Sequence, residues 1–67
     1  MNKLELYAEM QRNDLTLDKM AKRLGISSNA FWRKSNGHND FTLSEIQKIE
    51  EILKLTPDQT RVIFFNQ

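Results

Sequence analysis

Glycine occurs at only two positions in this chain of 67 residues, and each glycine ends a segment that has helical spacing. Apolar residues recur every three or four residues from Leu17 through Met20 to Leu24, and Gly25 follows at once. Gly37 follows residues 28–36 in the same way. Glycine is typical of the position just past a helix C-terminus, because it adopts the left-handed backbone conformation without steric strain. The two glycines therefore predict two helix ends.

The start signals of helices agree with these ends. Thr16 and Ser27 stand where a side-chain hydroxyl accepts an otherwise unpaired backbone N–H of a first helical turn. The segments Thr42-Leu43-Ser44-Glu45 and Thr56-Pro57-Asp58-Gln59 have the pattern of a capping box, and an earlier amphipathic segment stops at Asn13-Asp14. We therefore expect an all-α protein with five short helices, at about residues 3–12, 17–24, 28–35, 43–54 and 57–65.

Size and composition exclude several classes of protein. A mass of 7.9 kDa leaves room for one domain, residues 1–67. The chain has no cysteine and one histidine, so we expect no disulfide, no metal site and no cofactor. It has no phosphate-binding loop and no serine with a plausible histidine–carboxylate pair, so we expect no enzyme and no small-molecule substrate. No apolar run approaches the roughly 20 residues of a membrane span, and no secretory signal is visible, so we expect a cytoplasmic protein.

The distribution of charge is more informative than the net charge of +1. Residues 15–39 carry five basic side chains and one acidic one, while residues 1–14 and 40–67 are both net acidic. A basic centre between acidic flanks is a modest electrostatic indication of a polyanionic partner. A solvated helix face has the same charges, and this alternative stays open on charge alone.

Residues 16–37 predict a helix-turn-helix, because two helices are joined there by a short turn that contains glycine. Ala21 is small where the two helices would cross, and Gly25 permits the turn. Ile26 and Phe31 would fill the angle between the helices. An ordinary helical hairpin is the alternative.

The stretch TLDKMAKRLGIS at residues 16–27, followed by Phe31 and Asn36-Gly37, resembles the helix-turn-helix of lambda-type phage repressors and Cro proteins. The ending from Phe41 to Phe65 is similar to that of small regulators from phages and prophages of low-GC Gram-positive bacteria. The resemblance covers nearly the whole chain and implies a compact five-helix bundle of the lambda-repressor-like DNA-binding type. It also implies a transcriptional regulator that occupies a double-stranded DNA operator and blocks transcription, in the bacterial cytosol or a phage-infected host.

The same resemblance assigns the contacts to DNA. Residues 28–35 are the recognition helix in the major groove. The base-contacting positions of the family fall on Ser28, Asn29, Trp32 and Arg33, and helical geometry also places these four on one face. The candidate phosphate ligands are Thr16, Lys19, Lys34, Asn36, Gly37, His38 and Asn39.

The chemistry of the four base-contacting candidates differs. Arg33 suits the O6 and N7 of guanine, and Asn29 suits the N6 and N7 of adenine. Ser28 is short and reaches a phosphate as readily as a base. Trp32 would pack on a thymine methyl group or on sugar edges, or else on the protein's own surface, at the stem of Lys19 or Lys34.

Four positions depart from the family pattern. Leu17 stands where glutamine commonly contacts a phosphate, and Ser28 where arginine or glutamine is frequent. Ser35 stands where an apolar residue often closes the core, and His38 where lysine or arginine is frequent. These departures predict weaker phosphate binding more than a different fold.

Two further hypotheses concern protein partners. A homodimer on DNA would use Val62 and Phe65, which lie off the pair Ile63 and Phe64 that we expect to face inward, although all four could serve the chain's own core. In the alternative function, the same scaffold is a protein-interaction module, such as an antitoxin, an anti-repressor or an adaptor. Such a module would bind its partner through Trp32 or the apolar C-terminal tail.

Overall fold

Five α-helices follow the start and stop signals of the sequence. The computed structural model describes residues 1–65, in which no strand occurs. The helices are α1 (Lys3–Arg12), α2 (Leu17–Leu24), α3 (Ser28–Ser35), α4 (Leu43–Leu53) and α5 (Pro57–Phe64). The all-α prediction is confirmed, and each helix lies within one residue of its expected bounds.

Side-chain caps fix where these helices begin. Thr16 and Ser27 accept the backbone N–H groups of Lys19 and Ala30, at 3.2 and 3.0 Å. Both capping boxes form as predicted, in front of α4 and α5. The end of α4 has no glycine, and Lys54 itself takes the left-handed conformation with φ +54°. The local signals therefore account for all the predicted starts and for most of the ends.

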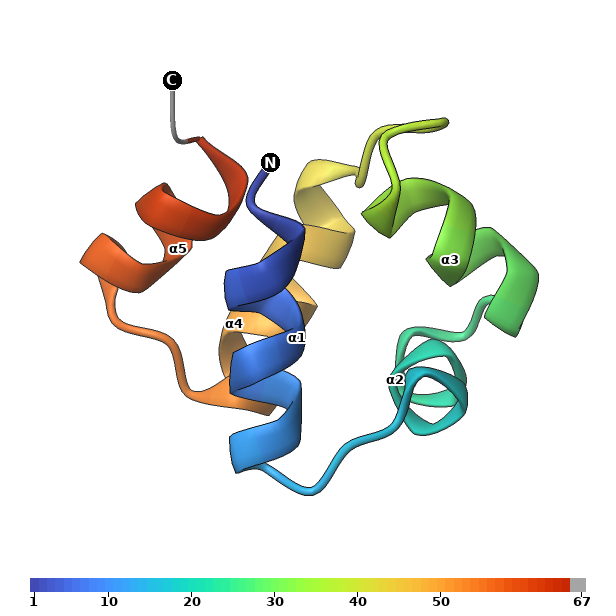
Figure 1. Cartoon of the computed structure of the whole chain (residues 1–67), viewed down its shortest axis with the longest axis horizontal. Coiled ribbons are helices and arrows are strands. Elements are labelled where there is room, and N and C mark those ends of the chain that lie inside the picture. The colour runs from blue at the N-terminus through green and yellow to red at the C-terminus, as the bar shows by residue number, and fades with distance from the viewer. Residues whose placement is uncertain (66–67) are drawn as a thin grey trace.

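The helices form two groups (Figure 1). α1, α4 and α5 occupy one side of the molecule, and α2 and α3 lie on the other. α1 packs on α5, and the backbone N–H of Asn2 donates to the carbonyl of Ile63 at 2.6 Å. α2 packs chiefly on α3 and also contacts α4. The pair α2 and α3 is thus joined to the rest through one side and exposed on the other.

Phe31 is one of the fully buried residues of the core. Its side chain is 0% exposed and lies among buried residues of the other four helices. Phe41, just before α4, makes edge contacts with the rings of Phe31 and Phe64, at centroid distances of 5.5 and 5.7 Å. Phe41 therefore links α3 to α5. None of the helices in residues 1–65 combines the length and the apolar character that crossing a lipid bilayer requires.

Candidate nucleic-acid interface

The turn between α2 and α3 sets the angle of the two helices. The N–H of Gly25 donates to the carbonyl of Lys22, and the N–H of Ile26 donates to the carbonyl of Ala21, at 3.1 and 3.0 Å. With Gly25 at φ +76°, these bonds form the Schellman motif, which satisfies the last carbonyls of a helix. A side chain at Gly25 would meet nothing within 4 Å, so backbone conformation alone favours glycine there. Ser27, two residues after Gly25, is already the N-cap of α3, so the turn between the two helices is short.

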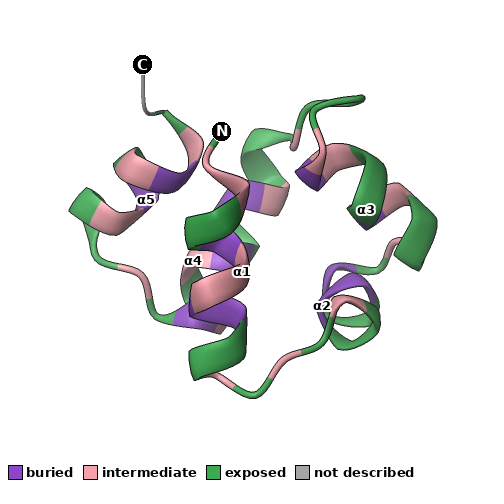
Figure 2. Cartoon of the chain, viewed as in Figure 1, coloured by how far each residue is buried: buried purple, intermediate pink, exposed green. Residues whose placement is uncertain are grey.

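One face of α3 is exposed, and it carries the four predicted base-contacting residues. Ser28, Asn29, Trp32 and Arg33 are all exposed, whereas Phe31 is fully buried on the opposite side. Exposed positions of α2 and α3 lie at the edge of the molecule (Figure 2). The predicted grouping of these four residues on one exposed face is therefore present.

Arg33 is held in place from the loop that follows α3. Its Nε donates to Oδ1 of Asn39 at 3.2 Å, while the rest of the side chain is exposed. The two terminal nitrogens of the guanidinium then remain as a forked pair of donors. Asn39, predicted as a phosphate ligand, here orients Arg33.

Trp32 has a partner that the sequence analysis did not consider. Its ring stacks on the ring of His38 with a centroid distance of 5.6 Å and an interplanar angle of 19°, and the residue is still 47% exposed. Trp32 also borders a groove of about 530 Å³, together with Tyr7, Leu15 and Leu17. Leu17, at the start of α2, thus lines an apolar groove and offers no polar group there.

Several polar groups of the loop after α3 are bonded within the protein. The amide of Asn36 donates to the carbonyl of Trp32 at 2.8 Å and accepts from Nζ of Lys3 at 2.8 Å. The backbone N–H groups of Gly37 and His38 donate to the carbonyls of Lys34 and Arg33.

The other predicted phosphate ligands differ in availability. Lys19 is exposed, and the hydroxyl of Thr16 caps α2. Lys34 is half-buried and donates to both carboxylate oxygens of Glu45, at 2.6 and 2.8 Å. This ion pair joins α3 to α4. It is largely shielded from solvent, because the two side chains are only 17% and 13% exposed. Lys34 is therefore engaged inside the protein, while Lys19 faces solvent.

The Lys34–Glu45 pair makes stability depend on pH. Burial raises the pKa of the Glu45 carboxyl, but hydrogen bonds from Lys34 and from the N–H of Thr42, with the charge of Lys34, outweigh burial and hold that pKa below its ordinary value. A carboxyl group of this kind contributes stability that is present above its unfolded pKa. That contribution is lost as the pH falls through its folded pKa.

We expect the melting temperature of the wild type to approach that of Glu45→Gln as the pH falls from 7 to below about 4. Thermal unfolding followed by circular dichroism measures both proteins across this range. Glu51→Gln is the control, because Glu51 is exposed on the same helix. A gap between wild type and Glu45→Gln that stays constant with pH would contradict the assignment.

Ser35 is a polar residue that is buried at the C-terminal end of α3. It is 1% exposed, and its Oγ donates to the carbonyl of Trp32 at 3.0 Å. The hydroxyl of Tyr7 lies 2.6 Å from the same Oγ. Because the single hydroxyl hydrogen of Ser35 goes to the Trp32 carbonyl, Tyr7 is the donor in this second bond. α1 therefore fixes the C-terminal end of α3.

Asp18 of α2 is a polar residue beside the exposed face of α3, and the sequence did not indicate it as a site residue. Its Oδ1 accepts a hydrogen bond of 2.6 Å from the hydroxyl of Ser28. The only signal for this contact in the sequence is that each residue lies in the first turn of its helix, Asp18 in α2 and Ser28 in α3. Whether two such residues meet depends on the angle between the helices, which the loop at Gly25 sets.

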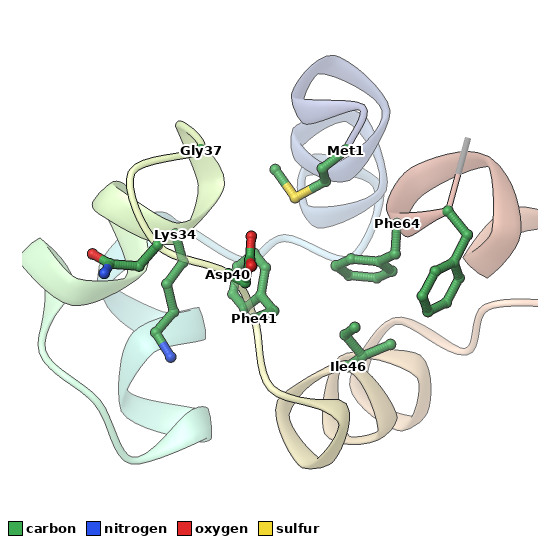
Figure 3. Close-up of a pocket in the computed structure, with 9 residues that line it drawn as sticks. Met1, Lys34, Gly37, Asp40, Phe41, Ile46 and Phe64 are labelled. Atoms are coloured by element: carbon green, nitrogen blue, oxygen red, sulfur yellow. The ribbon is translucent and has the colours of Figure 1, made fainter. Parts of the chain in front are cut away.

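The two predicted dimer residues lie in different surroundings. Phe65 is 53% exposed and borders a pocket of about 340 Å³. Three residues converge on this pocket (Figure 3): Met1 from the N-terminus, Phe41 from the loop before α4, and Phe64 from α5. Val62 is partly buried in another groove, beside Glu5 and Glu9 of α1. As expected, Ile63 faces inward and Phe64 packs against the core.

No protein-family model, curated protein or solved structure matches this chain.

Proposed function

We propose that this chain is a sequence-specific regulator that binds double-stranded DNA, with α2 and α3 as a helix-turn-helix of the Cro and repressor type. The observation that carries the proposal is the single exposed face of α3, on which Asn29 and Arg33 stand beside Ser28 and Trp32. These side chains present groups that suit base edges in a major groove. The opposite side of α3 is held by the buried Phe31 and Ser35.

The dimensions of α3 suit this role. An α-helix with its side chains is about 10–12 Å in diameter. The major groove of B-DNA is about 12 Å wide and admits an α-helix. α3 lies at the periphery of the molecule (Figure 1), so the rest of the chain does not obstruct its approach to a groove.

The exposed basic side chains around α3 supply the attraction to phosphates. Lys19, Lys22 and Arg23 are exposed on α2, and Arg33 is exposed on α3. Each phosphate that they neutralise releases counterions, so binding should weaken as salt is added. Because Lys34 is paired with Glu45, we expect a modest affinity for DNA that depends more on base contacts than on phosphate contacts.

The mode of regulation follows from occupancy. A protein bound to an operator excludes polymerase from the same duplex. In a dimer formed through Phe65, the two recognition helices would contact half-sites about one helical turn, 34–36 Å, apart. The exposed ring of Phe65 is the feature that favours this surface over Val62.

Selection from a pool of random duplexes at low salt, followed by sequencing, tests the proposal. We expect enrichment of an inverted repeat with half-site centres about one turn apart. Enrichment of a single short site would keep DNA recognition and remove the dimer. If no duplex is enriched at any salt concentration, the proposed function is wrong.

One observation favours the alternative function, a protein-interaction module such as an antitoxin, an anti-repressor or an adaptor. The groove beside Trp32 is lined by Leu15 and Leu17, where a DNA-binding protein would gain from polar phosphate ligands. The same selection separates the two functions, because a module of this kind enriches no duplex.

A further inference from the structure

A carboxylate lies beside the first residue of the recognition helix. Asp18 and Ser28 are both exposed, and the hydroxyl of Ser28 lies 2.6 Å from Oδ1 of Asp18. Asp18 is the second residue of α2, and Ser28 is the first residue of α3. The turn at Gly25 brings these two helix starts together.

Chemistry fixes the direction of this hydrogen bond. An ionised carboxylate has no hydrogen to donate, so Ser28 is the donor and Asp18 is the acceptor. Ser28 has one hydroxyl hydrogen, and the bond to Asp18 uses it. What remains on both side chains is lone pairs, so the pair presents only acceptors to a ligand.

An acceptor pair cannot bind a phosphate. Phosphate oxygens are themselves acceptors, and they carry the same negative charge as Asp18. The two destinations that the sequence left open for Ser28 were a phosphate and a base, and the bond to Asp18 favours the base. In the major groove the donors are the N6 amino group of adenine and the N4 amino group of cytosine. Guanine and thymine present oxygen acceptors in the corresponding places.

We infer that Asp18 and Ser28 together select a base that presents an exocyclic amino group in the major groove, which is adenine or cytosine. The inference rests on the proposed function, because it needs α3 in the major groove. It adds Asp18 to the DNA-contacting residues and removes Ser28 from the phosphate contacts.

The rest of the exposed face has the opposite polarity. Arg33 presents only donors, and Asn39 holds its Nε. Ser28 and Arg33 are five residues apart, which is about 7.5 Å along a helix axis. Base pairs are stacked about 3.4 Å apart, so along the DNA axis the two contacts fall at most about two base pairs from each other. The half-site should therefore contain an adenine or a cytosine within about two positions of a guanine.

Base analogues test the inference on the duplex that the selection enriches. At the position assigned to the pair, adenine is replaced by purine, or cytosine by 2-pyrimidinone. Each analogue lacks only the exocyclic amino group. Binding of the full chain is measured by fluorescence anisotropy. We expect the analogue to weaken wild-type binding about 5- to 100-fold. Asp18→Asn and Ser28→Ala should show little difference between the natural base and its analogue.

Asp58→Asn is the matched control. Asp58 is the second residue of α5, so it has the same place in its helix as Asp18, and it is also exposed. This variant loses the same charge and should keep the full dependence on the amino group. Asp18→Asn removes a negative charge beside the DNA and should also bind unrelated duplexes somewhat more tightly.

The outcomes separate this inference from the proposed function. Wild-type binding that is indifferent to the amino group overturns the role of the pair and leaves DNA recognition intact. Dependence that persists in Asp18→Asn and Ser28→Ala overturns it as well. Failure to enrich any duplex overturns both.

Discussion

Replacing Phe31 by alanine is expected to leave the protein largely unfolded in dilute buffer. Phe31 is fully buried, and removal of a buried phenylalanine side chain costs about 3–5 kcal/mol of unfolding free energy. The core of a chain below 70 residues rarely supplies more than about 3–5 kcal/mol of net stability. The loss is therefore comparable with the whole stability of the fold. Phe41 would lose its edge contact at the same time.

Urea unfolding measured by far-ultraviolet circular dichroism checks this prediction. Leu4→Ala is the matched control, because it also truncates a large apolar side chain, on a residue that is 77% exposed. We expect the control to change the unfolding free energy by less than about 0.5 kcal/mol. A Phe31→Ala protein that keeps most of the wild-type helix signal and midpoint would show that the core does not depend on this ring.

The helices were predictable because their signals are local. A cap such as Thr42 with Glu45 spans four residues, so its geometry forms within about one turn whatever the rest of the chain does. The same holds for Gly25, whose left-handed conformation needs only its own backbone. Phe31 was expected to fill the angle between the two helices, and it is fully buried.

The polar contacts between helices were not predictable in this way. Tyr7 and Ser35 are 28 positions apart, and nothing in either segment indicates the other. Lys34 was predicted to be a phosphate ligand, as one of the basic residues in the segment that resembles a helix-turn-helix. Its pairing with Glu45 depends on how α3 packs relative to the start of α4. Such pairs are set by tertiary packing.

The candidate site also has a part that was predictable from local sequence and a part that was not. The exposed face with Asn29 and Arg33 follows from the period of one helix. The contacts that orient the face come from other segments: Asn39 holds Arg33, and Asp18 accepts from Ser28. The period of α3 therefore indicates which side chains are exposed, whereas the direction of their donors and acceptors depends on contacts with other segments.

Arg33→Ala is expected to remove the preference for guanine at one position of the bound DNA and to leave the other positions unchanged. A bidentate contact between arginine and guanine supplies about 1–3 kcal/mol of discrimination, which is about 5- to 150-fold in relative affinity. The fold should not change, because the side chain is exposed and its contact within the described residues is a single hydrogen bond to Asn39. Repeating the duplex selection with the variant measures the preference at every position.

Arg23→Ala separates this effect from the loss of a positive charge. Arg23 is exposed in the last turn of α2 and lies outside the face formed by α3, so its removal should weaken binding to all duplexes alike. Arg33→Lys keeps the charge but loses the forked pair of donors, and should resemble Arg33→Ala in preference while keeping more of the affinity. Asn39→Ala should weaken the preference for guanine at the same position in part, because Arg33 loses the group that orients it. If Arg33→Ala lowers affinity uniformly, as Arg23→Ala is expected to do, then Arg33 contacts a phosphate. The orientation of α3 in the groove would then have to be rotated away from the face proposed here.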